Sequence, residues 1–417
     1  MPAPVKRMVT AAALLSLLSA CPDDQNETQF SDIEPRVATW KEGAWSIEKR
    51  DVGSRSTINS LFGRTASGKP VSLRVKDNAV LVAHWSGSAW EEETAATLSE
   101  NGTGDILTSG RVTEGPDGRV YVMFMVSSGT PYLLAEKASG GYAITTLPNI
   151  SPICYDIAVS ETGQAYGLFP DYDAFRTRLI TVDAEGAIST TDVASDVMCG
   201  SLAVDPVTDQ PGVVLWAAGG DSGGMVAALT ERTSEGWSTR EVAADGYLEC
   251  DSCLIPQLDY RGDGAAVISY VNSSLVLTVA VEQPDQLFKR TGVSAPGLAS
   301  QSTSFQRLAN GSLAMVYVLN TNAVYKGTIS SDGFVPSLFG AADLAIYPRM
   351  AVNGNSIILS YWGDGNLQAA APLELEASVV DPATAYGYQL GSFLSAFTDE
   401  DGSTVIQLFY NEVHVLE

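Results

Sequence analysis

The sequence is poor in the side chains that enzymes most often use for proton transfer and metal binding. It has two histidines, His84 and His414, and both stand in strand-like runs, so we interpret them as structural. It has one Gly-x-Ser-x-Gly match, at residues 220–224, but no helical pattern follows it as a nucleophile elbow requires, and it has no His-Glu-x-x-His pair and no phosphate-binding P-loop. The sequence therefore predicts no catalytic residue, no cofactor and no metal ligand.

Basic residues are also scarce. The chain has 24 Lys and Arg against 49 Asp and Glu, a formal net charge of −25. Such a charge repels phosphate backbones and anionic lipid headgroups, which argues against nucleic acid and against direct lipid binding. It suits a well-solvated acidic exterior, a cationic partner or a divalent ion.

Several acid-rich stretches invite a calcium or ligand interpretation. Residues 170–175 ("PDYDAF") and 259–264 ("DYRGDG") lack the ligand spacing of an EF-hand loop, so we interpret them as solvated turns. Residues 398–405 ("TDEDGSTV") are loosely similar to the Asp-box turn of sialidases. The other repeats do not share that pattern. The tripeptide at 261–263, Arg-Gly-Asp, is interpreted as a chance match within a hairpin.

Long apolar runs are absent except at the N-terminus. Lys6 and Arg7 precede an apolar stretch from Met8 to Ala20, thirteen residues, which is too short to span a hydrocarbon core of about 30 Å. This pattern predicts an export signal over residues 1–20. The alternatives are an ordinary signal peptide that carries a cysteine by chance and a lipoprotein signal.

The end of that stretch favours the lipoprotein signal. Leu18-Ser19-Ala20-Cys21 resembles the lipobox of bacterial lipoproteins, and the resemblance implies that Cys21 is acylated and becomes the new N-terminus. Removal of Lys6 and Arg7 leaves a formal charge of −27. Residues 21–30 are polar without apolar periodicity, so we expect a flexible tether.

The remainder of the chain repeats two short phrases. The first is a Gly turn followed by a strand that ends in an aromatic residue, as in "PDGRVYVMF" at Gly118 and "ANGSLAMVY" at Gly311. Eight copies, those near Gly68 and Asp209 being weaker, are separated by 43 to 55 residues. The second phrase pairs a Gly turn with alternating polar and apolar residues, as in "EGAWSIEKRDV" at Trp45. It also occurs eight times, faintly near residues 288, 334 and 375.

These phrases predict an all-β fold. Short runs rich in Val, Ile, Tyr and Phe between Gly, Asp and Asn turns are typical of hairpins. Two hairpins in a unit of this length make one four-stranded blade of a β-propeller. Along the chain, the copy nearest the N-terminus belongs to the second phrase, and the copy nearest the C-terminus belongs to the first phrase. We therefore expect eight blades in one domain over residues 31–417, one of them built from both chain ends; seven blades is the alternative. The chain resembles bacterial lipoproteins with an extracytoplasmic β-propeller domain.

Four further cysteines, Cys154, Cys199, Cys250 and Cys253, are an even number, which favours disulfides in an exported chain. Cys154, Cys199 and Cys253 each stand nine to eleven residues before the turn of their repeat. We therefore expect them at equivalent positions on the inner strands of three successive blades. Of the three possible pairings we favour Cys154–Cys199 with Cys250–Cys253. A redox centre lacks the strand–helix setting it needs, and a four-thiolate zinc site is the remaining alternative.

Aromatic residues recur at the end of the second strand of most blades, and we expect them to pack blades together. These residues are Phe124, Trp216, Tyr270, Tyr317, Tyr361 and Phe409.

Two functions fit these observations. The first is a lipid-anchored, non-catalytic propeller that binds or scaffolds a protein or glycan partner. The second is an extracellular hydrolase or lyase acting on polysaccharide with carboxylates near the channel mouth. We favour binding, at the periplasmic or cell-surface side of the bacterial envelope, on the outer membrane.

Overall fold

The computed structural model describes residues 30–415 apart from several gaps. The gaps are 42, 50–59, 65–67, 87–89, 99–106, 149–154, 196–197, 219–224, 235, 247–254, 295–302, 320–322, 342–345, 364–365, 371–377, 382–392 and 400. The described residues form β-strands and turns, and among them no helix is long and apolar enough to cross a membrane.

The described strands form eight four-stranded antiparallel sheets, which we number as blades 1 to 8. Blade 1 consists of β3 (Ser60–Arg64), β4 (Pro70–Lys76), β5 (Ala79–Trp85) and β6 (Trp90–Thr97). Blade 2 consists of β7 (Leu107–Glu114), β8 (Val120–Val126), β9 (Pro131–Glu136) and β10 (Tyr142–Thr146). Blade 3 consists of β11 (Asp156–Val159), β12 (Ala165–Asp171), β13 (Arg176–Val182) and β14 (Ile188–Ala194). Blade 4 consists of β15 (Gly200–Val204), β16 (Pro211–Ala218), β17 (Met225–Thr233) and β18 (Gly236–Gly246).

The second half of the chain continues in the same order. Blade 5 consists of β19 (Gln257–Tyr260), β20 (Ala266–Val271), β21 (Leu277–Glu282) and β22 (Phe288–Gly292). Blade 6 consists of β23 (Thr303–Arg307), β24 (Leu313–Leu319), β25 (Ala323–Ser330) and β26 (Gly333–Ala341). Blade 7 consists of β27 (Ile346–Asn353), β28 (Ser356–Gly363), β29 (Asn366–Ala370) and β30 (Ser378–Asp381). Blade 8 consists of β31 (Phe393–Thr398), β32 (Thr404–Val415), β1 (Phe30–Lys41) and β2 (Ala44–Lys49).

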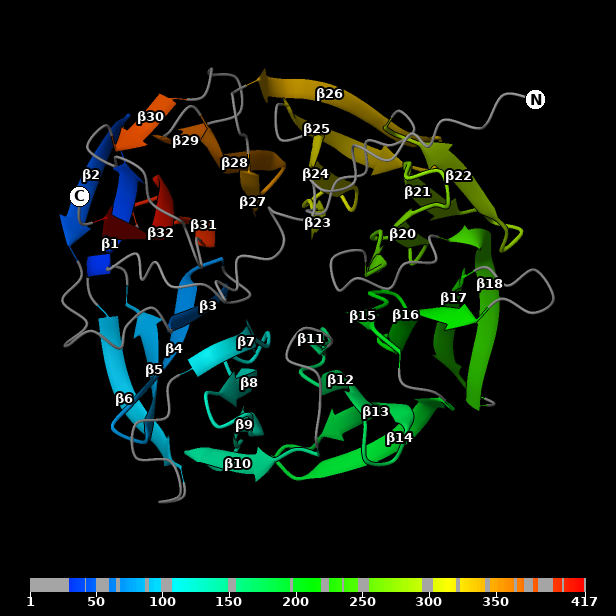
Figure 1. Cartoon of the computed structure of the whole chain (residues 1–417), viewed down its shortest axis with the longest axis horizontal. Coiled ribbons are helices and arrows are strands. Elements are labelled where there is room, and N and C mark those ends of the chain that lie inside the picture. The colour runs from blue at the N-terminus through cyan, green and yellow to red at the C-terminus, as the bar shows by residue number, and fades with distance from the viewer. Residues whose placement is uncertain are drawn as a thin grey trace, which may run out of the picture.

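The sheets are arranged as a ring, a β-propeller (Figure 1). The first strand of each blade lies nearest the ring axis and the fourth lies at the rim, as β7 and β10 show in blade 2. The inner strands of neighbouring blades therefore follow one another around the axis.

Blade 8 joins the two ends of the chain, as the order of the repeated phrases predicts. β31 and β32 supply its inner strands, and β1 and β2 supply its outer strands. β1 pairs with β32 in a register that runs from Phe30↔Val415 to Trp40↔Ile406. The first strand thus begins at Phe30, one residue inside the expected tether, because that residue still has a ladder partner.

The turn between the first and second strands needs a left-handed backbone. Gly118, Gly163, Gly264 and Gly402 have φ between +82° and +86°. Blade 4 has Asp209 there instead, with φ +58°. Glycine adopts this conformation without strain, and Asp tolerates it better than most residues. This substitution explains why the blade 4 phrase is weak.

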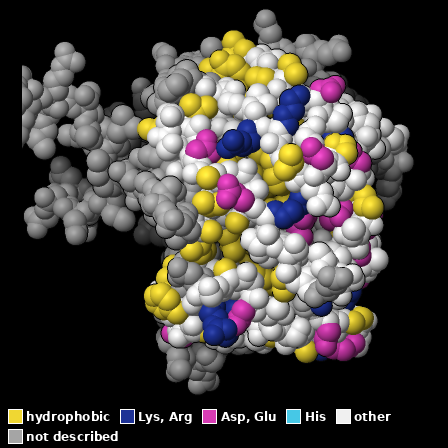
Figure 2. All heavy atoms as spheres, turned by 90° about the vertical axis from the view of Figure 1, so that its right-hand side faces the viewer, with side chains coloured by type: hydrophobic (Ala, Val, Ile, Leu, Met, Phe, Trp, Pro, Cys, Tyr) yellow, Lys and Arg dark blue, Asp and Glu magenta, His cyan; other side chains and the backbone are white. Residues whose placement is uncertain are grey.

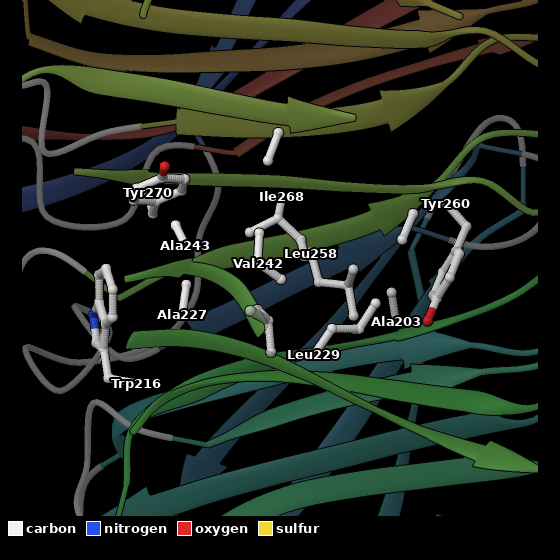
Figure 3. Packing of buried hydrophobic residues seen from close by; sticks show 13 residues of the cluster. Ala203, Trp216, Ala227, Leu229, Val242, Ala243, Leu258, Tyr260, Ile268 and Tyr270 are labelled. Atoms are coloured by element: carbon white, nitrogen blue, oxygen red, sulfur yellow. The ribbon is translucent and has the colours of Figure 1, made fainter. Parts of the chain in front are cut away.

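The recurring aromatic side chains pack between blades. Five of them, Phe124, Trp216, Tyr270, Tyr317 and Tyr361, are at most 6% exposed, which confirms the packing interpretation for those five. Figure 3 shows the cluster between blades 4 and 5, where Trp216 and Tyr270 lie edge to face with ring centroids 6.1 Å apart. Burial of each such ring contributes about 2–3 kcal/mol. The side chain of Phe409 lies outside the described residues.

Polar contacts also join every pair of neighbouring blades. Backbone amides of one turn bond carbonyls of the next turn between blades 2 and 3, 5 and 6, and 6 and 7. The other five seams use side chains. The contacts, from the blade 8/blade 1 seam onward, are Ser395 to Gly68, Tyr142 to Glu93, Ala138 to Ala184, Glu161 to Asp209, Leu258 to Ser201, Gly262 to Gly311, Ala309 to Gly354 and Asn353 to Thr398.

The closing blade provides a direct test of the ring. Ala38 of β1 is fully buried against β32 and blade 7, whereas Ala44 of β2 is exposed on the same blade. We expect Ala38→Asp to lower the free energy of unfolding by about 3 kcal/mol or more, because it buries an unpaired carboxylate. Ala44→Asp is the control and should change it by less than about 0.5 kcal/mol. Equal effects in thermal denaturation would contradict the burial of β1 in the ring.

Candidate functional site

The side chains of the inner strands around the ring axis are the natural candidate site, because propellers commonly use the ends of this axis for binding. Six of the described inner strands contain charged residues. They are Arg64 on β3, Arg111 and Glu114 on β7, Asp156 on β11, Asp259 on β19, Arg307 on β23 and Arg349 on β27.

Asp156 links two blades. Its Oδ2 accepts a hydrogen bond from the Leu202 amide of blade 4 at 3.1 Å, and its Oδ1 accepts one from the Ile157 amide at 3.0 Å. Burial raises the pKa of Asp156, while Arg111 and these two amides oppose the rise. Both carboxylate oxygens are therefore committed to the protein backbone.

Asp259 is the corresponding group on blade 5. Burial raises its pKa to about 6, and the charge of Arg307 and the Tyr260 amide, 2.7 Å from Oδ1, limit the rise. A carboxyl with such a pKa is partly protonated near neutral pH.

Arg307 connects blades that are not neighbours in the ring. Its Nη1 lies 3.3 Å from Oε1 of Glu161 in the β11–β12 turn, and its Nε donates to the Tyr260 carbonyl at 3.3 Å. Blades 4 and 5 lie between blades 3 and 6, so this ion pair reaches across the ring axis at the end where the β11–β12 turn lies. The two residues are 146 positions apart in the sequence, and no sequence pattern predicts the pair.

The two axial aspartates do not form an acid–base pair. The side-chain charge that acts on each comes from an arginine of a neighbouring blade, and neither shifts the pKa of the other. The paired carboxyls of glycosidases lie about 5 to 10 Å apart and face one substrate atom. The axial aspartates therefore do not form the site expected for the hydrolase alternative.

A third unusual carboxyl lies at the seam between blades 1 and 2. Glu114 Oε2 is buried without a hydrogen-bond partner, and it lies 3.7 Å from Nδ1 of His84 on β5. Burial, followed by the charges of Glu136 and Asp117, raises the pKa of Glu114 to about 7. Sequence analysis missed this pair. The sequence offered one signal. Glu114 stands four residues before the turn glycine Gly118, and the equivalent position is occupied by Tyr260 in blade 5 and Arg307 in blade 6.

The histidines do not form a common site within the described residues. The His84 side chain is 35% exposed beside Glu114. The backbone of His414 pairs with Asp32 in β1, and its side chain lies outside the described residues. The structural interpretation of His414 therefore stays a prediction.

The acid-rich turns use their carboxylates for local structure. Asp171 is 2% exposed, accepts from the amides of Asp173 and Ala174, and pairs with Arg178 at 2.7 Å. In the other stretch Asp263 pairs with Arg261 at 2.6 Å, so the charges of the Arg-Gly-Asp tripeptide neutralise each other. Among the described residues no three acidic, His or Cys side chains are grouped to hold a metal ion.

The stretch similar to an Asp box closes blade 8. The Ser403 amide and the Lys41 ammonium hold the pKa of Asp401 at about 2, and Lys41 also lies 3.0 Å from Asp399. Because Lys41 belongs to β1, these contacts join the first strand to the last hairpin. The stretch therefore has a structural role.

Charges on the rim are balanced locally as well. Figure 2 shows Lys and Arg side chains interspersed with Asp and Glu on the side of the ring formed by blades 4 and 5. Arg240 bridges Glu231 and Glu282, and Arg290 pairs with Asp245 at 3.2 Å. Such local pairing leaves no large single-sign patch among the described residues on this side, despite the net charge.

One of the predicted cysteines can be placed. Cys199, directly before β15, is disulfide-bonded. Cys21, Cys154, Cys250 and Cys253 lie outside the described residues. The pairing and the lipidation therefore stay predictions.

Comparison with known proteins shows the fold. No family model and no curated protein matches the sequence. The Dos1 propeller has a TM-score of 0.50 at 9% identity, over 84% of this chain and 92% of that chain. A puromycin hydrolase has a TM-score of 0.46 at 14% identity over 84% of this chain, which spans 58% of the hydrolase. The Aleuria aurantia lectin in complex with Fucα1-6GlcNAc has a TM-score of 0.40 at 11% identity, over 67% and 97% of the two chains. The likeness to the Dos1 propeller supports a β-propeller fold, in agreement with the strand topology.

Glu114 yields a prediction on pH dependence. Its pKa of about 7 lies above the value of 4.5 for an unperturbed glutamate, so the folded state binds more protons between these values. This carboxyl therefore stabilises the fold least above pH 7. We expect Glu114→Gln to raise the free energy of unfolding at pH 8 by about 1–3 kcal/mol and to flatten its fall between pH 4.5 and 7.

The control is Glu91→Gln, an exposed acid on β6, the strand that pairs with β5 of blade 1. Urea denaturation at pH 5, 6, 7 and 8 measures both variants. A pH profile of Glu114→Gln that parallels the wild type would show that Glu114 has an ordinary pKa.

Proposed function

We propose that this protein is a lipid-anchored, extracytoplasmic lipoprotein whose propeller binds a protein or glycan partner without catalysis. The observation that carries the proposal is the way in which the axial charges are used. Asp156, Asp259 and Arg307 are held by backbone groups, and Arg307 also pairs with Glu161 across the axis. They thus form part of a rigid frame rather than a reactive pair.

Rigidity favours a binding role. Each of the eight seams carries a hydrogen bond in addition to apolar packing, so neighbouring turns are held in fixed relative positions. A surface that is ordered before a ligand arrives loses little conformational entropy on binding.

The lipobox-like stretch and the position at which the fold begins support the proposed anchor. Cys21 precedes β1 by nine residues, and these can extend to at most about 30 Å. The propeller would then stay close to the bilayer, and we propose the outer membrane of a bacterial cell as its location. The polar segment at 22–28 suits a linker between the lipid and blade 8.

The disulfide is proposed as a clamp between blades 3 and 4. Cys199 lies three residues before Leu202, whose amide bonds Asp156, and Cys154 lies two residues before Asp156 in the sequence. This register favours Cys154 as the partner of Cys199 and leaves Cys250 and Cys253 for each other. Such a bond closes a loop of about 45 residues and contributes about 3–4 kcal/mol.

Non-reducing peptide mapping tests the clamp. We expect a peptide pair that contains Cys154 and Cys199 and a separate peptide with an internal Cys250–Cys253 bond. A Cys199 peptide linked to Cys250 or Cys253 would overturn the pairing.

Capture from native membranes tests the binding role. We expect cross-linking of the membrane-bound protein to recover one reproducible protein partner, or glycan arrays to show specific binding by the soluble domain. The Cys21→Ser variant is the control. It should lose membrane association while the purified propeller keeps its thermal stability.

Two outcomes would contradict the proposal. Turnover of a polysaccharide by the purified protein, abolished by Asp259→Asn, would establish the hydrolase alternative. Membrane association of Cys21→Ser equal to that of the wild type would overturn the anchor.

A further inference from the structure

The turn between the second and third strands of blade 3 carries two exposed aromatic rings. Residues 172–175 join β12 to β13, and we call them the aromatic turn because they include Tyr172 and Phe175. Tyr172 is 42% exposed and Phe175 is 67% exposed. The other large apolar residues that are exposed in the described part of the chain are aliphatic. These two rings thus differ from the aromatic residues that pack between blades.

The backbone of the aromatic turn is held in place from within the blade. The Asp171 carboxylate is 2% exposed and accepts hydrogen bonds from the amides of Asp173 and Ala174. A buried carboxylate with such bonds fixes the path of the chain around the turn. The two rings are therefore presented to solvent in a fixed arrangement.

Phe175 occupies a backbone position that suits glycine. Its φ is +58°, and the corresponding turn of blade 2 has Gly129 with φ +80°. A bulky residue adopts this left-handed conformation at an energetic cost, whereas glycine does not. Because the exposed ring adds little to the packed core, the strain and the exposure together indicate a use outside the fold.

The aromatic turn and the start of the fold lie on the same face of the ring. Strands alternate in direction within each blade, so the turns between first and second strands lie at one end of the ring axis, and the turns between second and third strands lie at the other. Phe30 pairs with Val415, the last residue of the second strand β32. Phe30 therefore lies at the same end as the aromatic turn, and we call this end the tether face.

The charges beside the aromatic turn are partly balanced. The net charge of the chain argues against direct lipid binding, but Asp171 pairs with Arg178 at 2.7 Å, and Asp192 pairs with both Arg176 and Arg178. These pairs offset negative charge close to the rings. A zwitterionic lipid surface therefore meets little local repulsion at this place.

We propose that the tether face rests on the bilayer, with Tyr172 and Phe175 in contact with the lipid headgroup region. Aromatic side chains favour this region, where one part of the ring meets apolar chains and another meets water. The proposal rests on the proposed anchor at Cys21. Two rings alone bind lipid weakly, and an attached lipid raises their effective concentration at the membrane.

Two separate attachments determine how the ring is oriented. Blade 8, which the tether enters, and blade 3, which carries the aromatic turn, lie well apart around the ring (Figure 1). Contact at both places holds the tether face along the membrane. The opposite end of the ring, where Glu161 of the β11–β12 turn pairs with Arg307, then faces away from the membrane and is accessible to a partner.

Tryptophan quenching in vesicles tests the docking. The full-length lipidated protein is reconstituted into phosphatidylcholine vesicles with brominated acyl chains, which quench nearby tryptophan. After subtraction of the wild-type signal, we expect the emission of Phe175→Trp to fall by about half or more relative to unbrominated vesicles. Val207→Trp is the matched control. Val207 is 64% exposed in the β15–β16 turn at the opposite end of the ring, so this variant should keep its emission.

Phe175→Gly keeps the test valid if the tryptophan variant folds poorly. Glycine adopts the left-handed conformation without strain, so the melting temperature should be unchanged or higher. In the wild type, the amides of the aromatic turn should exchange hydrogen several-fold more slowly on phosphatidylcholine vesicles than in the soluble Cys21→Ser variant. Phe175→Gly should lose this protection while it stays bound to the vesicles. Equal quenching of Phe175→Trp and Val207→Trp, or no added protection of the turn, would overturn the docking.

The docking and the anchor can fail in distinguishable ways. Failure of the vesicles to retain the wild-type protein would refute the anchor and, with it, the docking. Retention without quenching of Phe175→Trp would keep the anchor and refute the docking. Loss of glycan or protein binding in Phe175→Gly, without any quenching in Phe175→Trp, would also refute the docking and assign the aromatic turn to the partner-binding surface.

Discussion

The pairing of β1 with β32 is the interaction on which the ring depends. A propeller whose last blade stayed open would expose two strand edges, with their unpaired amides and carbonyls, to solvent and to other chains. Here the first strand completes the last blade along a ladder from Phe30 to Trp40, and Lys41 pairs with Asp399 and Asp401 at its end. Closure makes every blade a neighbour of two others.

The closed ring explains how an acidic chain remains compact. Many of the acids in the turns accept hydrogen bonds from nearby amides, as Asp183 does from Glu185 and Ala187. Others pair with arginines across a seam, as Glu282 does with Arg240. These contacts offset local repulsion, and the remaining charge keeps the exterior solvated. The excess of acidic residues therefore lies on the exterior, whereas the inner strands around the axis also contain arginines.

Repetition made much of the fold predictable. The Gly turns and terminal aromatics recur in most blades because each blade meets the same backbone and packing requirements. The phase of the two phrases also predicted that blade 8 combines both chain ends. The weak copy near Asp209 still forms a blade, because Asp can adopt the left-handed turn conformation that Gly provides elsewhere.

The candidate sites were predictable to a much smaller extent. The Arg307–Glu161 pair depends on which inner strands lie opposite each other around the axis. Spacing along the sequence contains no such information. Glu114 looks like an ordinary strand-end acid until the structure places it in a buried seam beside His84, Glu136 and Asp117. The repeated residues specify the fold of the ring, whereas the side chains of the candidate sites are residues that differ from one repeat to the next.

Hydrogen exchange measured by mass spectrometry tests the closure most directly. We expect the amides of β1 and β32 to exchange as slowly as those of β16 and β17 in blade 4, and all four strands to lose protection together as denaturant is added. Rapid exchange of β1 and β32 while β16 and β17 remain protected would contradict it. Blade 8 would then be a loosely attached end rather than the closure of the ring.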